Sequence, residues 1–318
     1  MFGELPKLFD RNFAVGFFLP VGIFITLSGV ILNSYPFGPD ISVFLEIDLL
    51  IGTTILGLLS WIGGIVLLAV NRDLYRFMEG YGSLNPVKLF GWFEKRRYRN
   101  TLKELDELNT EYRACIESEQ EFPTKSRQKR NKIIRRLSTE FPDKEELLLP
   151  TPFGNALRSF EIYPRAMYGL DSIDAWGRLL AVMPKDYVEL VNSARSQVDF
   201  WVNLGLVFIL LQIEYLGLAI ATGAQLNWGI VVLWIVLGAI APLRATSSAR
   251  EWGDYVKSSF DVFAPKLRET LGIEPPKNRE EEFAQWQKFS QAIIYRLPNQ
   301  MPELRGAEEG EEQRPPKK

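Results

Sequence analysis

Residues 49–70 read LLIGTTILGLLSWIGGIVLLAV and contain no charged side chain. A helix needs about 20 apolar residues to cross the hydrocarbon core of a bilayer, which is about 30 Å thick. Helices on the surface of soluble proteins carry a polar stripe at helical spacing, whereas the polar residues here are small ones such as Thr53, Thr54 and Ser60. The pattern therefore predicts a transmembrane helix rather than a buried helix of a soluble core.

Three further apolar runs complete the pattern. Residues 13–32 read FAVGFFLPVGIFITLSGVIL, and no small-x-small cleavage site follows them, so we interpret this run as a retained span rather than a signal peptide. A third run at residues 200–221 is interrupted by Glu214, and a shorter fourth run occupies residues 226–243. The sequence therefore predicts an all-α, four-span helical membrane protein with a helical cytoplasmic domain.

The four spans define the expected organisation of the chain. We expect an N-terminal transmembrane hairpin at 1–70 (spans 13–32 and 49–70), a cytoplasmic helical region at 71–199, a second transmembrane hairpin at 200–243 (spans 200–221 and 226–243), cytoplasmic C-terminal helices at 244–297 and a tail at 298–318. We expect this tail to be disordered because it is acidic and rich in proline and glycine.

Lysine and arginine residues near the span ends predict the orientation. They are frequent from Arg72 to Arg99, after the second span, and also follow the fourth span. The connections at 33–48 and 222–227 contain none. Because cytoplasmic loops carry an excess of Lys and Arg, we expect both termini and residues 71–199 to face the cytoplasm, in a plasma membrane or a bacterial inner membrane.

The composition argues against several kinds of active site. The 318-residue chain has no histidine and one cysteine, Cys115. The commonest general base and metal ligand is therefore missing, no Ser-His-Asp or Cys-His set can form, and no Walker A or dinucleotide fingerprint is present. We expect a non-enzymatic protein without metal or cofactor, in which Cys115 forms no internal disulfide.

Two paired helices are predicted early in the cytoplasmic region, at about 94–121 and 124–140. Seven Lys or Arg residues lie between Lys125 and Arg136. We interpret this basic run first as a solvated helix face and second as a lipid contact. Nucleic-acid binding comes third, because the chain lacks the motifs of an RNA-binding module.

Aromatic and basic residues alternate close to the second span, in FGWFEKRRYRN at residues 90–100. Aromatic side chains suit the membrane interface, and arginine clusters suit anionic headgroups. Ordinary positive-inside topology is the alternative explanation. The candidates for contact with anionic headgroups are Lys95, Arg96, Arg97 and Arg99.

The stretch 151–184 reads TPFGNALRSFEIYPRAMYGLDSIDAWGRLLAVMP. It predicts two short helices, at about 153–162 and 172–182, joined by a proline and glycine corner. The order TP-x-G-N-x-LR, YP, YGLD and W-x-RL is similar to a segment of uncharacterised bacterial multi-span membrane proteins, and this resemblance implies no activity. The candidate residues that hold the corner together are Asn155, Arg158, Glu161, Arg165 and Asp171.

Glu214 is the most informative residue inside the spans. A rise of 1.5 Å per residue from Phe200 places it roughly 20 Å across the bilayer, where an ionisable group is costly unless it is paired, protonated or in contact with water. One interpretation is a pore-lining or proton-linked carboxylate beside Gln212. The other is a protonated structural group bonded to the hydroxyl of Thr26, Ser28, Thr53 or Thr54.

These features leave two functional hypotheses. The first is an oligomeric channel or pore, which Glu214 facing the axis of a homo-oligomer would favour. The alternative is a membrane-anchored scaffold whose cytoplasmic helices recruit a cytosolic protein, which an exposed Trp and Phe stripe on the last helix, starting near Asn278, would favour. In both cases we expect the lipid bilayer as a partner and no nucleic acid.

Overall fold

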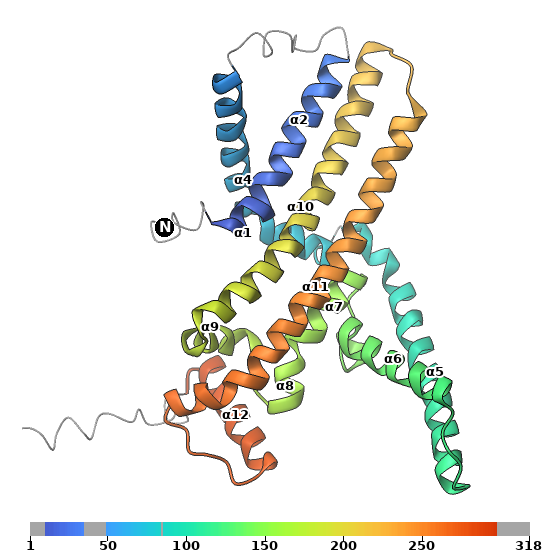
Figure 1. The fold of residues 1–318 in the computed structure, drawn as a ribbon, viewed down its shortest axis with the longest axis vertical. Coiled ribbons are helices and arrows are strands. Elements are labelled where there is room, and N and C mark those ends of the chain that lie inside the picture. Colours follow the sequence, from blue (N-terminus) through green and yellow to red (C-terminus); the bar gives the residue numbers. More distant parts are fainter. Residues whose placement is uncertain (1–9, 35–48, 84, 298–318) are drawn as a thin grey trace, which may run out of the picture. The chain divides into compact units, whose positions relative to one another are not determined.

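A computed structural model describes residues 10–34, 49–83 and 85–297 of the chain. The predicted disordered tail at 298–318 and most of the first outer connection at 33–48 lie outside these residues. Within them, every regular element is helical and no strand occurs, so the predicted all-α class is confirmed (Figure 1). The helices are α1 (Arg11–Phe13), α2 (Leu19–Asn33), α4 (Leu49–Glu79), α5 (Gly91–Glu117), α6 (Thr124–Glu140), α7 (Pro152–Glu161), α8 (Tyr163–Tyr168), α9 (Ser172–Val182), α10 (Lys185–Thr222), α11 (Trp228–Thr270) and α12 (Arg279–Ile294).

Four helical segments are long and apolar enough to cross a membrane, as the sequence predicted. They are Arg11–Asn33, Leu50–Glu79, Lys185–Thr222 and Trp228–Thr270. The last two continue well past the predicted spans, since α10 has 38 residues and α11 has 43. The fourth apolar helix begins at Trp228 rather than at 226, because the Asn227 side chain accepts a hydrogen bond from the Gly229 amide (2.9 Å) and so ends the preceding loop.

The chain forms two compact units, each built from three segments. Unit 1 comprises residues 1–92, 149–154 and 192–252, and unit 2 comprises residues 93–148, 155–191 and 253–318. Unit 1 contains the apolar runs of all four predicted spans. It also contains residues 71–92 and 149–154, which the sequence assigned to the cytoplasmic region.

The core of unit 1 is formed by apolar side chains of α2, α10 and α11. Leu211 is fully buried, and the rings of Phe208 and Trp234 pack with centroids 6.0 Å apart. Gly205 lets α10 approach α11, because a Cβ at this position would lie 3.3 Å from Cβ of Ala241. Close packing through small residues is typical of helix pairs in membranes.

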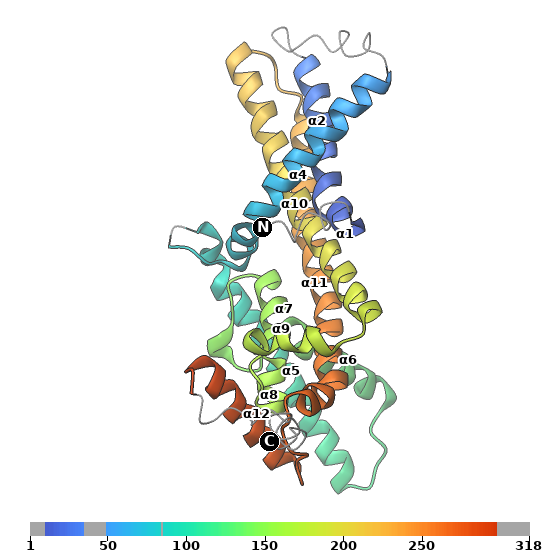
Figure 2. The same ribbon diagram turned by 90° about the vertical axis from the view of Figure 1, so that its left-hand side faces the viewer.

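Helix α4 packs beside α2 in the same unit (Figure 2). A Cβ on Gly63 would lie 2.6 Å from Cγ1 of Val21, so only glycine fits at this contact. The opposite side of α4 is apolar and exposed, with 56% of Leu58 and 58% of Val66 accessible. Gly63 and Gly64 of the second apolar run therefore serve packing within the chain.

A short π-helical stretch, η2 (Ala14–Phe18), lies between α1 and α2. Pro20 follows it and has no N–H group, so the usual i→i−4 bond to the carbonyl of Gly16 cannot form. The irregular turn therefore has a local cause in the sequence, and it leaves the Gly16 carbonyl available to another partner.

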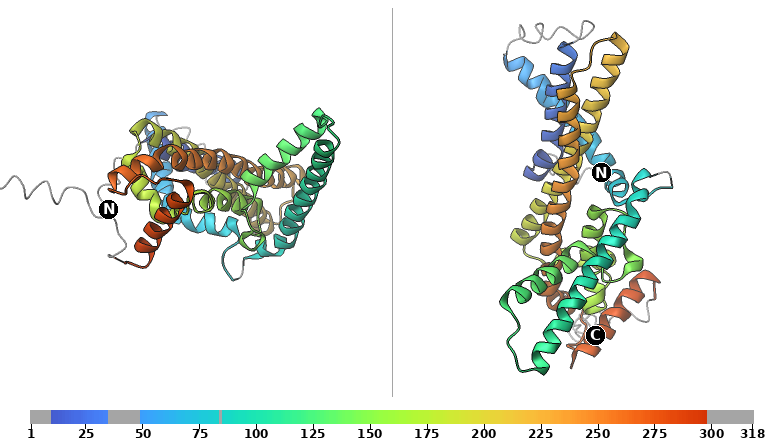
Figure 3. Two further views of the ribbon diagram at one scale, coloured as in Figure 1. Left: turned by 90° about the horizontal axis from the view of Figure 1, so that it is seen from below. Right: turned by 90° about the vertical axis from the view of Figure 1, so that its right-hand side faces the viewer.

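In unit 2, α5 and α6 form the predicted antiparallel hairpin (Figure 3). Lys129 pairs with Glu104 at 2.8 Å, and the Ser126 hydroxyl donates to Glu111 at 2.9 Å. Helix α6 has the predicted bounds. Helix α5 ends at Glu117, short of the predicted 121, because Glu119 turns the chain with a φ of +56°.

The rest of unit 2 packs around the aromatic residues Trp286 and Phe289 of α12 and Phe260 of α11, which are 0%, 2% and 0% exposed. The predicted corner between the two short helices contains a helix of its own, α8, which ends at Gly169 with a φ of +78°. A Cβ on Gly169 would lie 2.6 Å from the Phe283 carbonyl oxygen, so glycine is required both by backbone conformation and by space.

Candidate functional site: a buried polar cluster around Asp199

A carboxylate is buried where the apolar part of α10 begins. Asp199 is only 5% exposed. Its Oδ1 atom accepts hydrogen bonds from Nδ2 of Asn71 (2.9 Å) and from the hydroxyl of Tyr75 (2.8 Å). The two donors are four residues apart on α4, so they lie on one face of that helix and together hold α4 against α10.

The other carboxylate oxygen of Asp199 faces a cation and a close backbone. The Nε atom of Arg195, one turn earlier on α10, lies 3.9 Å from Oδ2. A Cβ on Gly16 would lie 3.1 Å from Cβ of Asp199, so the glycine lets η2 approach α10 closely.

Asn203 extends this polar cluster by one more helical turn. Its Nδ2 atom donates to the carbonyl oxygen of Gly16 at 2.8 Å, and this is the carbonyl that Pro20 leaves without its usual donor. Hydrogen bonds at one level of unit 1 thus join α10 both to α4 and to η2. Irregular helical turns of this kind are frequent at functional sites.

Two acceptor atoms of the cluster remain buried and unmatched. Oδ1 of Asn71 and Oδ1 of Asn203 have no hydrogen-bond partner within the described part of the chain. A buried acceptor without a donor is costly. The cluster can therefore accept further hydrogen bonds, from water or from a protonated group.

A second group of polar side chains, here called the Glu214 level, lies further along α10 and contains the predicted residue Glu214. The Ser28 hydroxyl donates to Oε1 of Glu214 at 2.7 Å, as the structural interpretation predicted for one of four hydroxyls. The other three, on Thr26, Thr53 and Thr54, bond to carbonyls of their own helices, Gly22 and Leu50. Thus Glu214 joins α10 to α2.

Two oxygen atoms at this level are also unmatched. Oε2 of Glu214 and Oε1 of Gln212 are buried and have no hydrogen-bond partner among the described residues. Between the two polar levels, the buried α10 residues Leu204, Val207 and Leu211 are apolar. An apolar layer therefore separates the Asp199 level from the Glu214 level within one chain.

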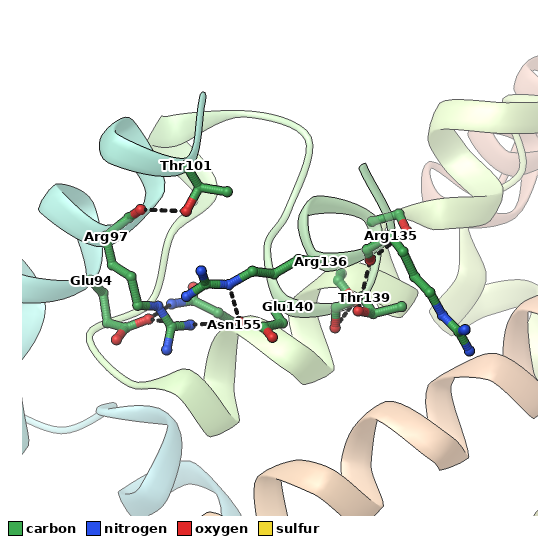
Figure 4. A network of polar contacts seen from close by, with 10 residues as sticks. Glu94, Arg97, Thr101, Arg135, Arg136, Thr139, Glu140 and Asn155 are labelled. Atoms are coloured by element: carbon green, nitrogen blue, oxygen red, sulfur yellow. Dashed lines mark hydrogen bonds and ion pairs between the residues drawn. The ribbon is translucent and has the colours of Figure 1, made fainter. Parts of the chain in front are cut away.

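Unit 2 contains a separate buried network, which includes the predicted residue Asn155 (Figure 4). Glu94 is 1% exposed, and its Oε2 accepts from Nδ2 of Asn155 at 3.0 Å and lies 3.1 Å from a guanidinium nitrogen of Arg97. Glu140 lies 3.5 Å from Arg97 and 3.1 Å from Arg136. Burial raises the pKa of Glu94, and the charge of Arg97 opposes that shift.

The remaining corner candidates have two different surroundings. Arg158 pairs with Glu161 at 3.7 Å, and burial raises the pKa of Glu161. Asp171 caps α9 by accepting from the Ile173 amide at 3.1 Å. Arg158, Arg165 and Asp171 share the lining of a pocket of 780 Å³ within unit 2, whereas Asn155 belongs to the Glu94 network.

The four basic residues predicted to contact headgroups also differ in their surroundings. Lys95 and Arg96 are exposed. Arg97 is directed at Glu94 and Glu140, and Arg99 makes a two-pronged ion pair with Glu145, with Nε 3.0 and 3.1 Å from its two oxygens.

Asp199 and its partners are not among the residues predicted from the sequence. A signal was present, because Asn71 and Tyr75 follow the second apolar run at i, i+4 spacing, and Asp199 and Asn203 begin the third run at the same spacing. Placing the span ends at 70 and 200 left Asn71 and Asp199 outside the expected membrane region.

No protein-family model, curated protein or solved structure matches this chain. Among the described residues, no three Asp, Glu or Cys side chains converge as a metal ion would require.

Proposed function

We propose that this protein is an integral membrane protein with four spans in a plasma membrane or bacterial inner membrane, with both termini and residues 71–199 in the cytoplasm. The contacts of unit 1 support this topology. Gly16, Asn71 and Asp199 meet at one level, and Arg244 lies over the ring of Trp201, 5.4 Å from its centroid. The segments rich in Lys and Arg then share one side, which the positive-inside rule makes cytoplasmic.

The exposed apolar face of α4 supports insertion as well. Side chains such as Leu50, Leu58 and Val66 are more than half exposed. A contiguous apolar surface on a helix of this length is unfavourable in water and suits contact with acyl chains.

The function that the geometry supports best is a membrane-anchored scaffold, in which the spans hold unit 2 at the cytoplasmic face for a cytosolic protein partner. The apolar layer between the Asp199 and Glu214 levels carries this proposal, because among the described residues it separates the two groups of buried polar side chains within one chain. Both buried acids bond to neighbouring helices of the same bundle, as structural groups would.

The partner surface differs from the one expected from the sequence. Trp286 and Phe289 of α12 are buried within unit 2, so α12 offers no Trp and Phe stripe. The hairpin of α5 and α6 is the better candidate, since it exposes 39% of Tyr112, 59% of Ile116 and 40% of Ile134 among charged residues.

An oligomeric channel is the second candidate. The unmatched oxygens of Glu214 and Gln212 favour it, because intramembrane polar groups often mark ion pathways. With an apolar layer inside each chain, such a pathway would run between the chains of a homo-oligomer.

Two measurements on the purified protein distinguish the candidates. Light scattering gives the mass of the detergent-solubilised particle, and liposomes loaded with K⁺ or Cl⁻ report flux. The scaffold predicts no flux above that of protein-free liposomes. Protein-dependent flux that changes in Glu214→Gln would favour the channel over the scaffold. The control variant is Gln120→Ala, at an exposed position outside the spans.

A further inference from the structure

A pocket of 640 Å³ in unit 1 adjoins the Asp199 cluster, with which it shares Asn71, Tyr75 and Arg195. Two further arginines line it, Arg72 and Arg76, which are one turn apart on α4. The three guanidinium groups outnumber the single lining carboxylate, that of Glu79. The pocket is therefore positively charged, and it is formed by residues of α4, α10 and α11 together with Tyr81.

Aromatic rings orient two arginines of this pocket, and among the described residues only Arg195 of the three pairs with a carboxylate. Within the part of the chain that the structure describes, no ion pair joins Arg72 or Arg76 to a carboxylate, and Arg195 lies 3.9 Å from Asp199. The guanidinium of Arg76 lies over the Tyr81 ring at 5.5 Å, and that of Arg195 over Trp252 at 5.9 Å. Stacking on an aromatic face leaves the N–H donors of a guanidinium free to bind a phosphate.

The pocket also lies where the apolar runs end. Arg72 follows the run that ends at Val70, and Arg195 precedes the run that starts at Phe200. Leu68 contributes an apolar wall and is 43% exposed. Guanidinium groups thus stand next to a surface suited to an acyl chain.

We propose that this pocket binds the headgroup of an anionic phospholipid. The guanidiniums of Arg72, Arg76 and Arg195 donate hydrogen bonds to the phosphate oxygens, in the forked geometry that arginine favours, while an acyl chain follows Leu68 along α4. Basic pockets between membrane helices on the cytoplasmic side are suited to such headgroups. The inference rests on the proposed membrane insertion.

A soluble phosphate shares the phosphate chemistry but not the apolar contact. A free anion would use the guanidiniums and gain nothing from Leu68, so phosphate alone should compete weakly. Ordinary positive-inside topology would also place arginines here. It would not require these arginines to line one pocket, and it would not make a lipid bind them in preference to other basic residues at the interface.

The test is lipid binding by the full-length protein in a neutral detergent, with bound lipids counted by native mass spectrometry. The probes are short-chain phosphatidylglycerol, phosphatidylcholine of the same chain length, and inorganic phosphate as a competitor. The test variant is Arg72→Gln/Arg76→Gln. The control is Lys95→Gln/Arg96→Gln, which removes two exposed positive charges outside the pocket.

We expect saturable binding of one phosphatidylglycerol per chain, little binding of phosphatidylcholine and only weak competition by millimolar phosphate. Binding should weaken about thirtyfold in the test variant, because each basic residue beside an anionic lipid contributes roughly a factor of five, and it should be nearly unchanged in the control. Equal loss in both variants, equal binding of both lipids, or displacement by phosphate alone would overturn the proposal. Circular dichroism melts of both variants confirm folding, and labelling of Cys115 with a membrane-impermeant maleimide tests insertion separately.

Discussion

Removing the Asp199 carboxylate tests whether it holds the helices of unit 1 together. Asp199→Ala leaves two buried donors, Nδ2 of Asn71 and the hydroxyl of Tyr75, without the acceptor they now reach at 2.9 and 2.8 Å. With about 1 kcal/mol or slightly more for each unmatched donor, the free energy of unfolding should fall by about 2–3 kcal/mol. For large domains this corresponds to a melting temperature lower by roughly 4–10 °C.

The matched variant Asp199→Asn separates hydrogen bonding from charge. It keeps an acceptor oxygen in place and removes only the attraction to Arg195, which is 3.9 Å away and whose side chain is 55% exposed. Such a pair contributes about 0–1 kcal/mol, so Asp199→Asn should remain close to wild type.

A double-mutant cycle assigns the effect to a single contact. Thermal melts in detergent, followed by circular dichroism, would compare Asp199→Ala, Tyr75→Phe and the double variant. The double variant should be less destabilised than the sum of the single ones by about 1 kcal/mol, since the two side chains share one hydrogen bond. Wild-type melting of Asp199→Ala, or equal destabilisation by Asp199→Asn and Asp199→Ala, would refute this role of the Asp199 carboxylate.

Two further predictions concern the other buried acids. Burial raises the folded-state pKa of Glu94, so its contribution to stability is complete below its unfolded pKa of about 4.3 and is lost as pH rises through the folded pKa. Glu94→Gln keeps an acceptor for Asn155 and should flatten the dependence of melting temperature on pH above 4; equal slopes in both proteins would contradict this. Glu214→Gln keeps the acceptor for Ser28 and should leave stability unchanged, whereas Glu214→Leu should cost on the order of 1 kcal/mol; equal melts for the two variants would refute the structural role.

The local features of the fold were predictable because the signals lie close together in the sequence. Helices α6 and α9 have the predicted bounds. Helix α12 starts where it was predicted, next to Asn278, whose side chain accepts a hydrogen bond from the Glu281 amide at 2.8 Å. Four apolar runs, one of them interrupted by Glu214, likewise predicted the four long helices.

The Asp199 cluster depends on packing between helices, so it could not be predicted from signals that lie close together in the sequence. Its members come from three apolar runs, and only the alignment of α10 with α4 and η2 brings Asn71 and Gly16 to Asp199. The same limit applied to Arg97, which the sequence placed among the candidates for lipid contact. Its pair with Glu94 has i, i+3 spacing and is local, whereas its pair with Glu140 depends on the packing of α6 beside α5, which spacing along the chain does not encode.

Labelling of the native cysteine tests the central claim, four spans with unit 2 in the cytoplasm, most directly. Cys115 is the only cysteine of the chain and lies on α5, partly exposed. A membrane-impermeant maleimide should modify it only after the cells are permeabilised. In a Cys115→Ser background, a cysteine at the exposed Ala224 should react in intact cells. Labelling of Cys115 in intact cells as strong as after permeabilisation would contradict the account.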